Sequence, residues 1–170
     1  MKKIEQPWVK VVKKGDVTVH PSASEAYLFS QNLTLQIQSK NLATTILNQP
    51  SFEFPIGCIV NKRVQIFANW RNLLINPVDD QQSITVLLFN KRLSQEVQYQ
   101  AWLYVMCNFS LSLHKNFILS HLFEFLDNCP AETQVRLFKN TDTSRSMSAL
   151  SNLLNVSRSS LRNAKTGKSS

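Results

Sequence analysis

The stretch from Met147 to Asn163 constrains the fold more than any other part of the chain. Its apolar residues fit two short helices, at about residues 148–154 and 157–164, with a tight turn between them. Four apolar side chains would pack the two helices against each other: Leu150, Leu154, Val156 and Leu161. This pattern predicts a helix-turn-helix.

Three polar residues fit the special positions of such a motif. Ser151 is small and falls where the two helices must approach most closely. Asn155 falls at the turn, where a residue that tolerates the left-handed backbone conformation is needed. Ser157 is a good N-cap for the second helix. Another amphipathic helical hairpin would share much of this pattern, and a Ser-rich basic tail can also be disordered.

The second helix of the motif leaves a basic and polar face to solvent. Arginine, serine and asparagine side chains bind phosphates and base edges, and a DNA-binding helix-turn-helix places its second helix in the major groove. Because this face lacks acidic residues, DNA is a better candidate partner than protein. We predict six DNA-contacting residues: Ser157, Arg158, Ser159, Arg162, Asn163 and Lys165.

Positive charge is concentrated at the two ends of the chain, whose formal net charge is +8. Residues 139–170 contain six Lys or Arg against one acid, Asp142, and residues 1–20 contain five Lys against Glu5 and Asp16. The middle is therefore close to neutral. This distribution favours a polyanionic partner, with nucleic acid as the first candidate. Charge that merely keeps two chain ends soluble is the alternative.

The N-terminal half has the pattern of short strands. Leu33 to Gln38 alternates strictly between apolar and polar residues, which is typical of a half-buried strand. We expect a turn at Gly15–Asp16, a loop at 21–24 and a turn at 77–80, while 43–47 is ambiguous between strand and helix. These signals predict an antiparallel β-roll or barrel. Its strands would lie at 8–12, 17–19, 26–29, 33–38, 58–60, 64–68 and 84–89.

The character of the sequence changes at about Asn90. Residues from Ser94 to His114 contain no Gly or Pro and predict the longest helix, with Ser94 as its N-cap. Its apolar face is wide enough to pack on the sheet and on a partner, so we predict a homodimer through this helix; a mere bridge between two domains is the alternative. Further helices are expected at 116–128 and 131–138.

These elements predict an α+β chain with three parts. Residues 1–90 would form a β-rich, sensor-like domain, 91–115 the long connecting helix, and 116–170 a helical DNA-binding domain that ends in the helix-turn-helix at 147–163.

The sequence offers no cluster of residues that suggests catalysis. His114 and His121 are seven residues apart, and no cysteine or acid is spaced to complete a metal site with them. The three cysteines are far apart, and there is no Gly-rich loop for phosphate. We therefore expect neither an enzyme nor a cofactor. No apolar run reaches the length of a membrane span, so we expect a cytoplasmic protein without membrane contact.

The order of a β domain, a long helix and a helix-turn-helix resembles the Crp-Fnr family of bacterial transcription regulators. Lys14 to Val17 is similar to the first strand-turn of that family's roll, and Ala26 to Phe29 with Leu33 to Leu35 is similar to its central hairpin. Gln49 to Gly57 fits the segment before the second half of the roll, and Val156 to Leu161 resembles the start of the recognition helix. The resemblance implies a dimeric, sequence-specific DNA-binding regulator.

Several family features are missing. Ser30-Gln31-Asn32 stands where the family has a glycine, and the phosphate-binding cassette of the cyclic-nucleotide members is absent around Gly57, so we do not expect cyclic-nucleotide binding. The four-cysteine cluster of the iron-sulfur members is absent as well. The chain ends about where the winged hairpin would begin. A shortened interaction protein, which pairs with another regulator without binding DNA, is therefore the alternative function.

The chain also resembles the AraC family of regulators. The first helix-turn-helix of that family has the same form as Met147 to Leu161 and follows helices and a β sensor domain. The second helix-turn-helix of that family has no counterpart in this chain.

Overall fold

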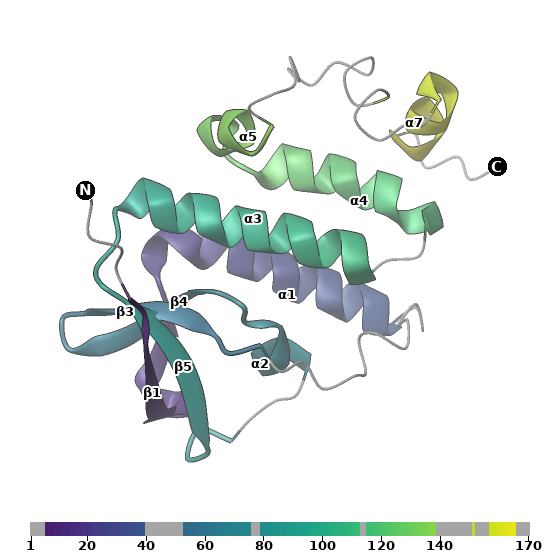
Figure 1. The fold of residues 1–170 in the computed structure, drawn as a ribbon. Helices are drawn as coiled ribbons and strands as arrows, with labels where there is room; N and C mark the ends of the chain where they lie inside the picture. Colours follow the sequence, from purple (N-terminus) through teal and green to yellow (C-terminus); the bar gives the residue numbers. More distant parts are fainter. Residues whose placement is uncertain are drawn as a thin grey trace.

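The computed structural model describes residues 6–39, 53–75, 79–112, 115–138, 151 and 157–165. The chain is built from α-helices and one β-sheet in layers (Figure 1). The twisted sheet forms one end of the molecule, helices α1 and α3 lie side by side next to it, and α4, α5 and α7 lie on the far side of α3. The sequence-based expectation of a chain with both α and β structure is thus confirmed.

The sheet has five strands in the order β1-β5-β3-β4-β2. Two pairs, β1 with β5 and β3 with β4, are antiparallel, whereas β2 with β4 and β3 with β5 are parallel. The strands are β1 (Trp8–Lys13), β2 (Val17–Val19), β3 (Ile56–Val60), β4 (Arg63–Ala68) and β5 (Ser83–Phe89).

The prediction of an all-antiparallel roll or barrel is therefore wrong in its strand directions. Parallel neighbours need long connections that usually contain a helix. Helices α1 (Ser24–Ser39) and α2 (Arg71–Ile75) lie in the connections that follow β2 and β4. Strands β1 and β2 form the two edges of the sheet, so the described strands make an open sheet and not a closed barrel.

Close contact between β3 and β4 requires a glycine at position 57. A Cβ atom on Gly57 would lie 2.6 Å from the carbonyl oxygen of Gln65, which real Cβ atoms essentially never do. The strand register shifts between Ile56 and Gly57, so the bulge and the glycine occur together. The missing side chain lets the two backbones approach.

Residues 26–29 and 33–38 were predicted to be strands, but both segments lie in helix α1, so these two predictions are wrong. Ala26 is fully buried and Leu33 is 9% exposed, whereas Leu35, which alternation would place on the same face as Leu33, is 58% exposed. Burial seven residues apart matches two turns of a helix. The Phe29 ring lies 5.8 Å from that of Trp102 in α3, so packing on α3 outweighs the local alternation.

The helices predicted at 94–114, 116–128 and 131–138 are confirmed, with small differences at their ends. They are α3 (Ser94–Ser112), α4 (Lys115–Asn128) and α5 (Ala131–Leu137). Helix α2 was not predicted, and the expected loop at 21–24 contains the 3-10 helix η2 (Pro21–Ala23). Gly15–Asp16 lies in the 3-10 helix η1 (Lys14–Asp16), and Gln82 closes a turn onto Asp79. The ambiguous segment 43–47 lies outside the described residues.

The buried residues form one hydrophobic cluster with Trp102 near its centre. Members of this cluster come from η2, α1, the sheet, α3, α4 and α7. The Trp102 ring packs edge-on against Phe125 of α4, and Trp70 packs edge-on against Tyr104 of α3. The division into three parts at residues 90 and 115 is not tested by this packing and stays a prediction.

Helix α3 contributes its most apolar face to this cluster. Its buried residues are Val97, Ala101, Trp102 and Val105, and its neighbours include η2, β4, α1 and α5. These four side chains are covered by other elements of the same chain. The homodimer predicted through Ser94–His114 therefore stays a prediction. In the described part of the chain, no helix combines the length and the apolar character needed to cross a lipid bilayer.

Candidate nucleic-acid interface

The predicted second helix of the helix-turn-helix is present as α7 (Arg158–Lys165). Ser157 caps it, because its Oγ accepts a hydrogen bond of 3.1 Å from the backbone N–H of Ser160. The same Oγ lies 2.8 Å from the hydroxyl oxygens of Ser159 and Ser160. The first turn of α7 is thus organised by a small group of hydroxyls.

Leu161 anchors α7 to the body of the protein. It is fully buried and belongs to the hydrophobic cluster, where α7 packs on α4. The other side chains that the structure describes on α7 are all exposed. Among the described side chains of α7, this one apolar contact therefore fixes which face of the helix turns outward.

The outward face carries the predicted residues Arg158, Ser159, Arg162 and Asn163, all of them exposed. Arg158 and Arg162 are one turn apart, as are Ser159 and Asn163, so the four side chains form two adjacent rows. The octapeptide of α7 contains two Arg and one Lys but no acid. This arrangement gives a compact cationic and hydrogen-bonding surface.

The other predicted elements of the motif are only partly described. Lys165 belongs to α7, but its side chain lies outside the described residues. Of the first predicted helix at about 148–154, the structure describes Ser151 alone, which is helical and half-buried. The turn residue Asn155 and the apolar Val156 lie outside the described residues. The structure therefore presents the second helix and not the whole motif.

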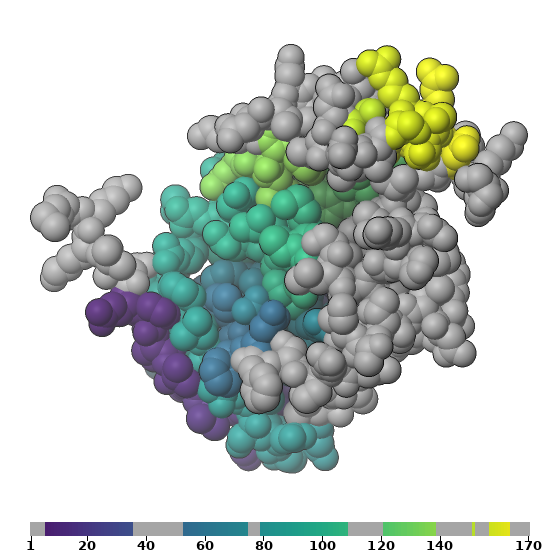
Figure 2. All heavy atoms as spheres, turned by 45° about the vertical axis from the view of Figure 1, so that its right-hand side comes forward, coloured from purple at the N-terminus to yellow at the C-terminus, as the bar shows by residue number. Residues whose placement is uncertain are grey.

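The described lysines of β1 and the cationic surface of α7 do not form one surface. Exposed Lys10 and Lys13 lie on β1, an edge strand of the sheet, whereas α7 lies at the opposite end of the molecule (Figures 1 and 2). Lys14 pairs with Asp80 at 2.8 Å. A ligand on α7 therefore meets the charge of α7 and not that of β1.

The histidines of the described residues have structural partners. His20 is 9% exposed, and its Nδ1 accepts a hydrogen bond of 3.2 Å from the backbone N–H of Ser22. Burial lowers the pKa of His20 below its ordinary value, which favours the neutral ring. His121 Nδ1 lies 3.0 Å from Oε2 of Glu124, one turn along α4.

The buried cysteines are poor nucleophiles. Burial raises the pKa of Cys129 to about 12, and it also raises the pKa of Cys58. Both thiols are therefore held in the protonated form at neutral pH. Among the residues that the structure describes, no three His, Cys, Asp or Glu side chains are placed to hold a metal ion.

Comparison with known proteins assigns no family, because neither a protein-family model nor a curated protein sequence matches this chain.

Proposed function

We propose that this protein is a DNA-binding transcription regulator and that α7 is its recognition helix. The observation that carries the proposal is the pairing of one buried residue, Leu161, with an otherwise exposed cationic surface on the same short helix. Such a helix is fixed in orientation by its anchor and presents arginines to an anionic partner.

The position of Arg158 supports an anionic partner. This residue is the first of α7, at the positive end of the helix dipole, where a cation is unfavourable by about 0.3–1 kcal/mol. A phosphate group at this end would interact favourably with both the guanidinium and the backbone N–H groups of the first turn.

The resemblance to the Crp-Fnr family rests chiefly on α7. The segment compared with the central hairpin of that family forms α1 instead, so it no longer supports the resemblance. The DNA-binding proposal depends on α7 and not on the family. Homodimer formation is proposed as an accompanying property, to be tested by sedimentation with and without DNA.

Fluorescence anisotropy with labelled random-sequence duplex DNA tests the proposal, at about 50 mM and 200 mM salt. We expect binding that weakens steeply as salt rises. The double variant Arg158→Ala with Arg162→Ala should bind more weakly, and each lost phosphate contact should lower the salt slope by about 0.9. Arg63→Ala with Lys91→Ala is the matched control, since it removes two exposed charges elsewhere.

Two results would contradict the proposal. Wild-type protein that does not bind duplex DNA at low salt excludes DNA binding, and an interaction protein that pairs with another regulator then becomes the preferred function. Binding that survives unchanged in the α7 double variant moves the DNA site away from α7.

A further inference from the structure

Strand β1 has a hydrogen-bonded neighbour on one side only. It stands at the end of the strand order, and among the described strands it pairs with β5 alone. Figure 1 shows it at the end of the molecule opposite α7. An unpaired edge of this kind presents its backbone N–H and C=O groups to an extended segment of another chain.

The register of β1 on β5 shows which backbone groups face outward. Hydrogen-bonded and non-hydrogen-bonded pairs alternate along an antiparallel ladder. The N–H of Lys14 donates to the carbonyl oxygen of Gln82 at 2.9 Å, which continues the β1–β5 register by one residue. The even-numbered residues of β1 therefore bond to β5. The N–H and C=O groups of Val9, Val11 and Lys13 point away from the sheet.

Apolar side chains are exposed along the same edge. Val9 and Val11 are 59% and 64% exposed and share one face of the strand, and Trp8 is partly exposed on the other face. A strand that adds to this edge would cover part of this apolar surface on both faces, which favours association. Nucleic acid offers neither the backbone partners nor the apolar side chains that this edge fits.

The charge of the edge limits the kind of segment that fits it. Lys10 and Lys13 are exposed, and the six residues of β1 contain no acid. The ammonium of Lys13 donates to Oε1 of Gln81 at 3.2 Å and keeps two further N–H donors. Lysines on an edge strand oppose pairing with a second copy, because like charges would meet. Acidic side chains directly opposite the two lysines would instead form favourable cross-strand pairs.

We propose that β1 is a docking edge for an extended acidic segment of a partner protein, which adds to the sheet as an antiparallel strand. Its backbone would exchange hydrogen bonds with Val9, Val11 and Lys13. Two acidic residues, three positions apart, would lie opposite Lys10 and Lys13. The inference does not depend on DNA binding, because β1 and α7 share no residue.

Fluorescence anisotropy of the full chain with a labelled hexapeptide, Glu-Thr-Val-Glu-Val-Thr, tests the proposal. We expect saturable binding at up to millimolar concentration. The same peptide with lysine in place of both glutamates should bind at least fivefold more weakly, since two attractive pairs become repulsive. N-methylation of the first glutamate and both valines removes the N–H groups that face β1 and should abolish binding. No saturable binding by the acidic peptide, equal binding of the acidic and lysine peptides, or undiminished binding of the methylated peptide would overturn the proposal.

Amide hydrogen exchange measured by NMR locates the peptide on the chain. In the free chain, the amides of Lys10 and Val12 should exchange slowly and those of Val9, Val11 and Lys13 quickly. The acidic peptide should slow these three outward amides. Protection that appears elsewhere but not at these three would overturn the proposal. Slow exchange of the three in the free chain at high but not at low protein concentration would assign the edge to a second copy, and would overturn it too.

Substitutions in β1 separate docking from folding. Lys10→Glu with Lys13→Glu should make the lysine peptide bind more tightly than the acidic one, a gain that misfolding cannot produce. Arg63→Glu with Lys91→Glu, two exposed cations outside β1, is the matched control and should keep the wild-type preference. An unchanged preference in the β1 variant, or a reversed one in the control, would place the peptide elsewhere.

Val11→Pro removes a backbone N–H that β5 does not use, and proline is tolerated on a strand edge whose N–H faces solvent. This variant should fold and lose the acidic peptide. A folded Val11→Pro variant that binds the peptide as tightly as wild type would overturn the proposal.

Discussion

Helices α3 and α7 use their side chains for opposite purposes. Helix α3 buries four apolar side chains among the sheet and its neighbouring helices, whereas the described side chains of α7 are all exposed except that of Leu161. A change in α3 should therefore act on the stability of the whole chain. A change in α7 should act on one helix and on what that helix binds.

The largest effect is expected from Trp102→Ala in α3. Trp102 is 1% exposed, and its ring packs against those of Phe29 and Phe125, so we expect a loss of about 3–5 kcal/mol in the free energy of unfolding. Urea unfolding followed by circular dichroism measures it. Trp8→Ala is the control, because Trp8 is 40% exposed on β1. Similar losses in both variants would mean that Trp102 is not central to the core.

Leu161→Ala should cost less and act locally. We expect a loss of about 2–5 kcal/mol in free energy, and the loss falls on Leu161, the one buried side chain among those described on α7. Amide hydrogen exchange should become fast in residues 158–165 while α3 stays protected, and DNA affinity should fall with it. Leu93→Ala, the same substitution at a leucine that is 72% exposed, serves as the control. Loss of protection in α3 as well would show that the two helices unfold together.

Ser157→Ala should weaken α7 by about 1 kcal/mol, since the backbone N–H of Ser160 loses its capping acceptor. Hydrogen exchange at the first turn of α7 measures this change. Ser157→Thr keeps a hydroxyl and should retain most of the protection. If the Ala and Thr variants exchange equally fast, the cap contributes nothing to the helix.

The smallest effect concerns the junction of sheet and α1, where His20 caps η2. Its pKa is lower in the folded chain than in the unfolded chain, so the unfolded chain takes up the proton first as pH falls. The stability that neutral His20 provides is present above about pH 6.5 and declines as pH falls below that value. His20→Asn, which keeps a capping acceptor, should flatten this decline in urea midpoints measured from about pH 7 to pH 5. An unchanged pH profile would assign the decline to other groups.

The local sequence was sufficient to predict helix α7 but not to predict helix α1. The cap Ser157 and the anchor Leu161 lie within five residues, so the pattern of α7 can be recognised in one short stretch. In α1, the alternation around Leu33 suggested a strand, and only contacts with distant Trp102 and Phe125 decide for a helix. The parallel strand pairs depend on such distant contacts as well.

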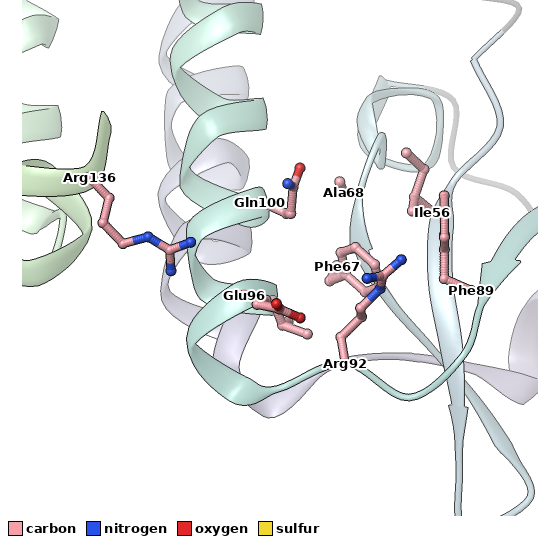
Figure 3. A pocket seen from close by; sticks show the side chains of 9 residues that line it. Ile56, Phe67, Ala68, Phe89, Arg92, Glu96, Gln100 and Arg136 are labelled. Atoms are coloured by element: carbon pink, nitrogen blue, oxygen red, sulfur yellow. The ribbon is translucent and has the colours of Figure 1, made fainter. Parts of the chain in front are cut away.

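A pocket of about 290 Å³ escaped sequence reasoning for a related reason (Figure 3). Arg92 and Arg136 belong to segments far apart in the chain, and neither stands in a motif. Each one alone looks like an ordinary surface arginine. Both line the pocket between the sheet, α3 and α5, and the packing of α5 on α3 that brings Arg136 there is encoded by no local pattern.

The placement of the aromatic residues also decides what fluorescence can detect. Trp70 and Trp102 are buried in apolar surroundings, where indole emission shifts to shorter wavelength, and Trp8 is partly exposed. Residues 139–170 contain no Phe, Trp or Tyr. Intrinsic fluorescence therefore follows the melting of the core directly and is almost blind to the release of α7. A thermal transition that appears earlier by circular dichroism than by tryptophan emission would be the optical signature of α7 detaching before the rest unfolds.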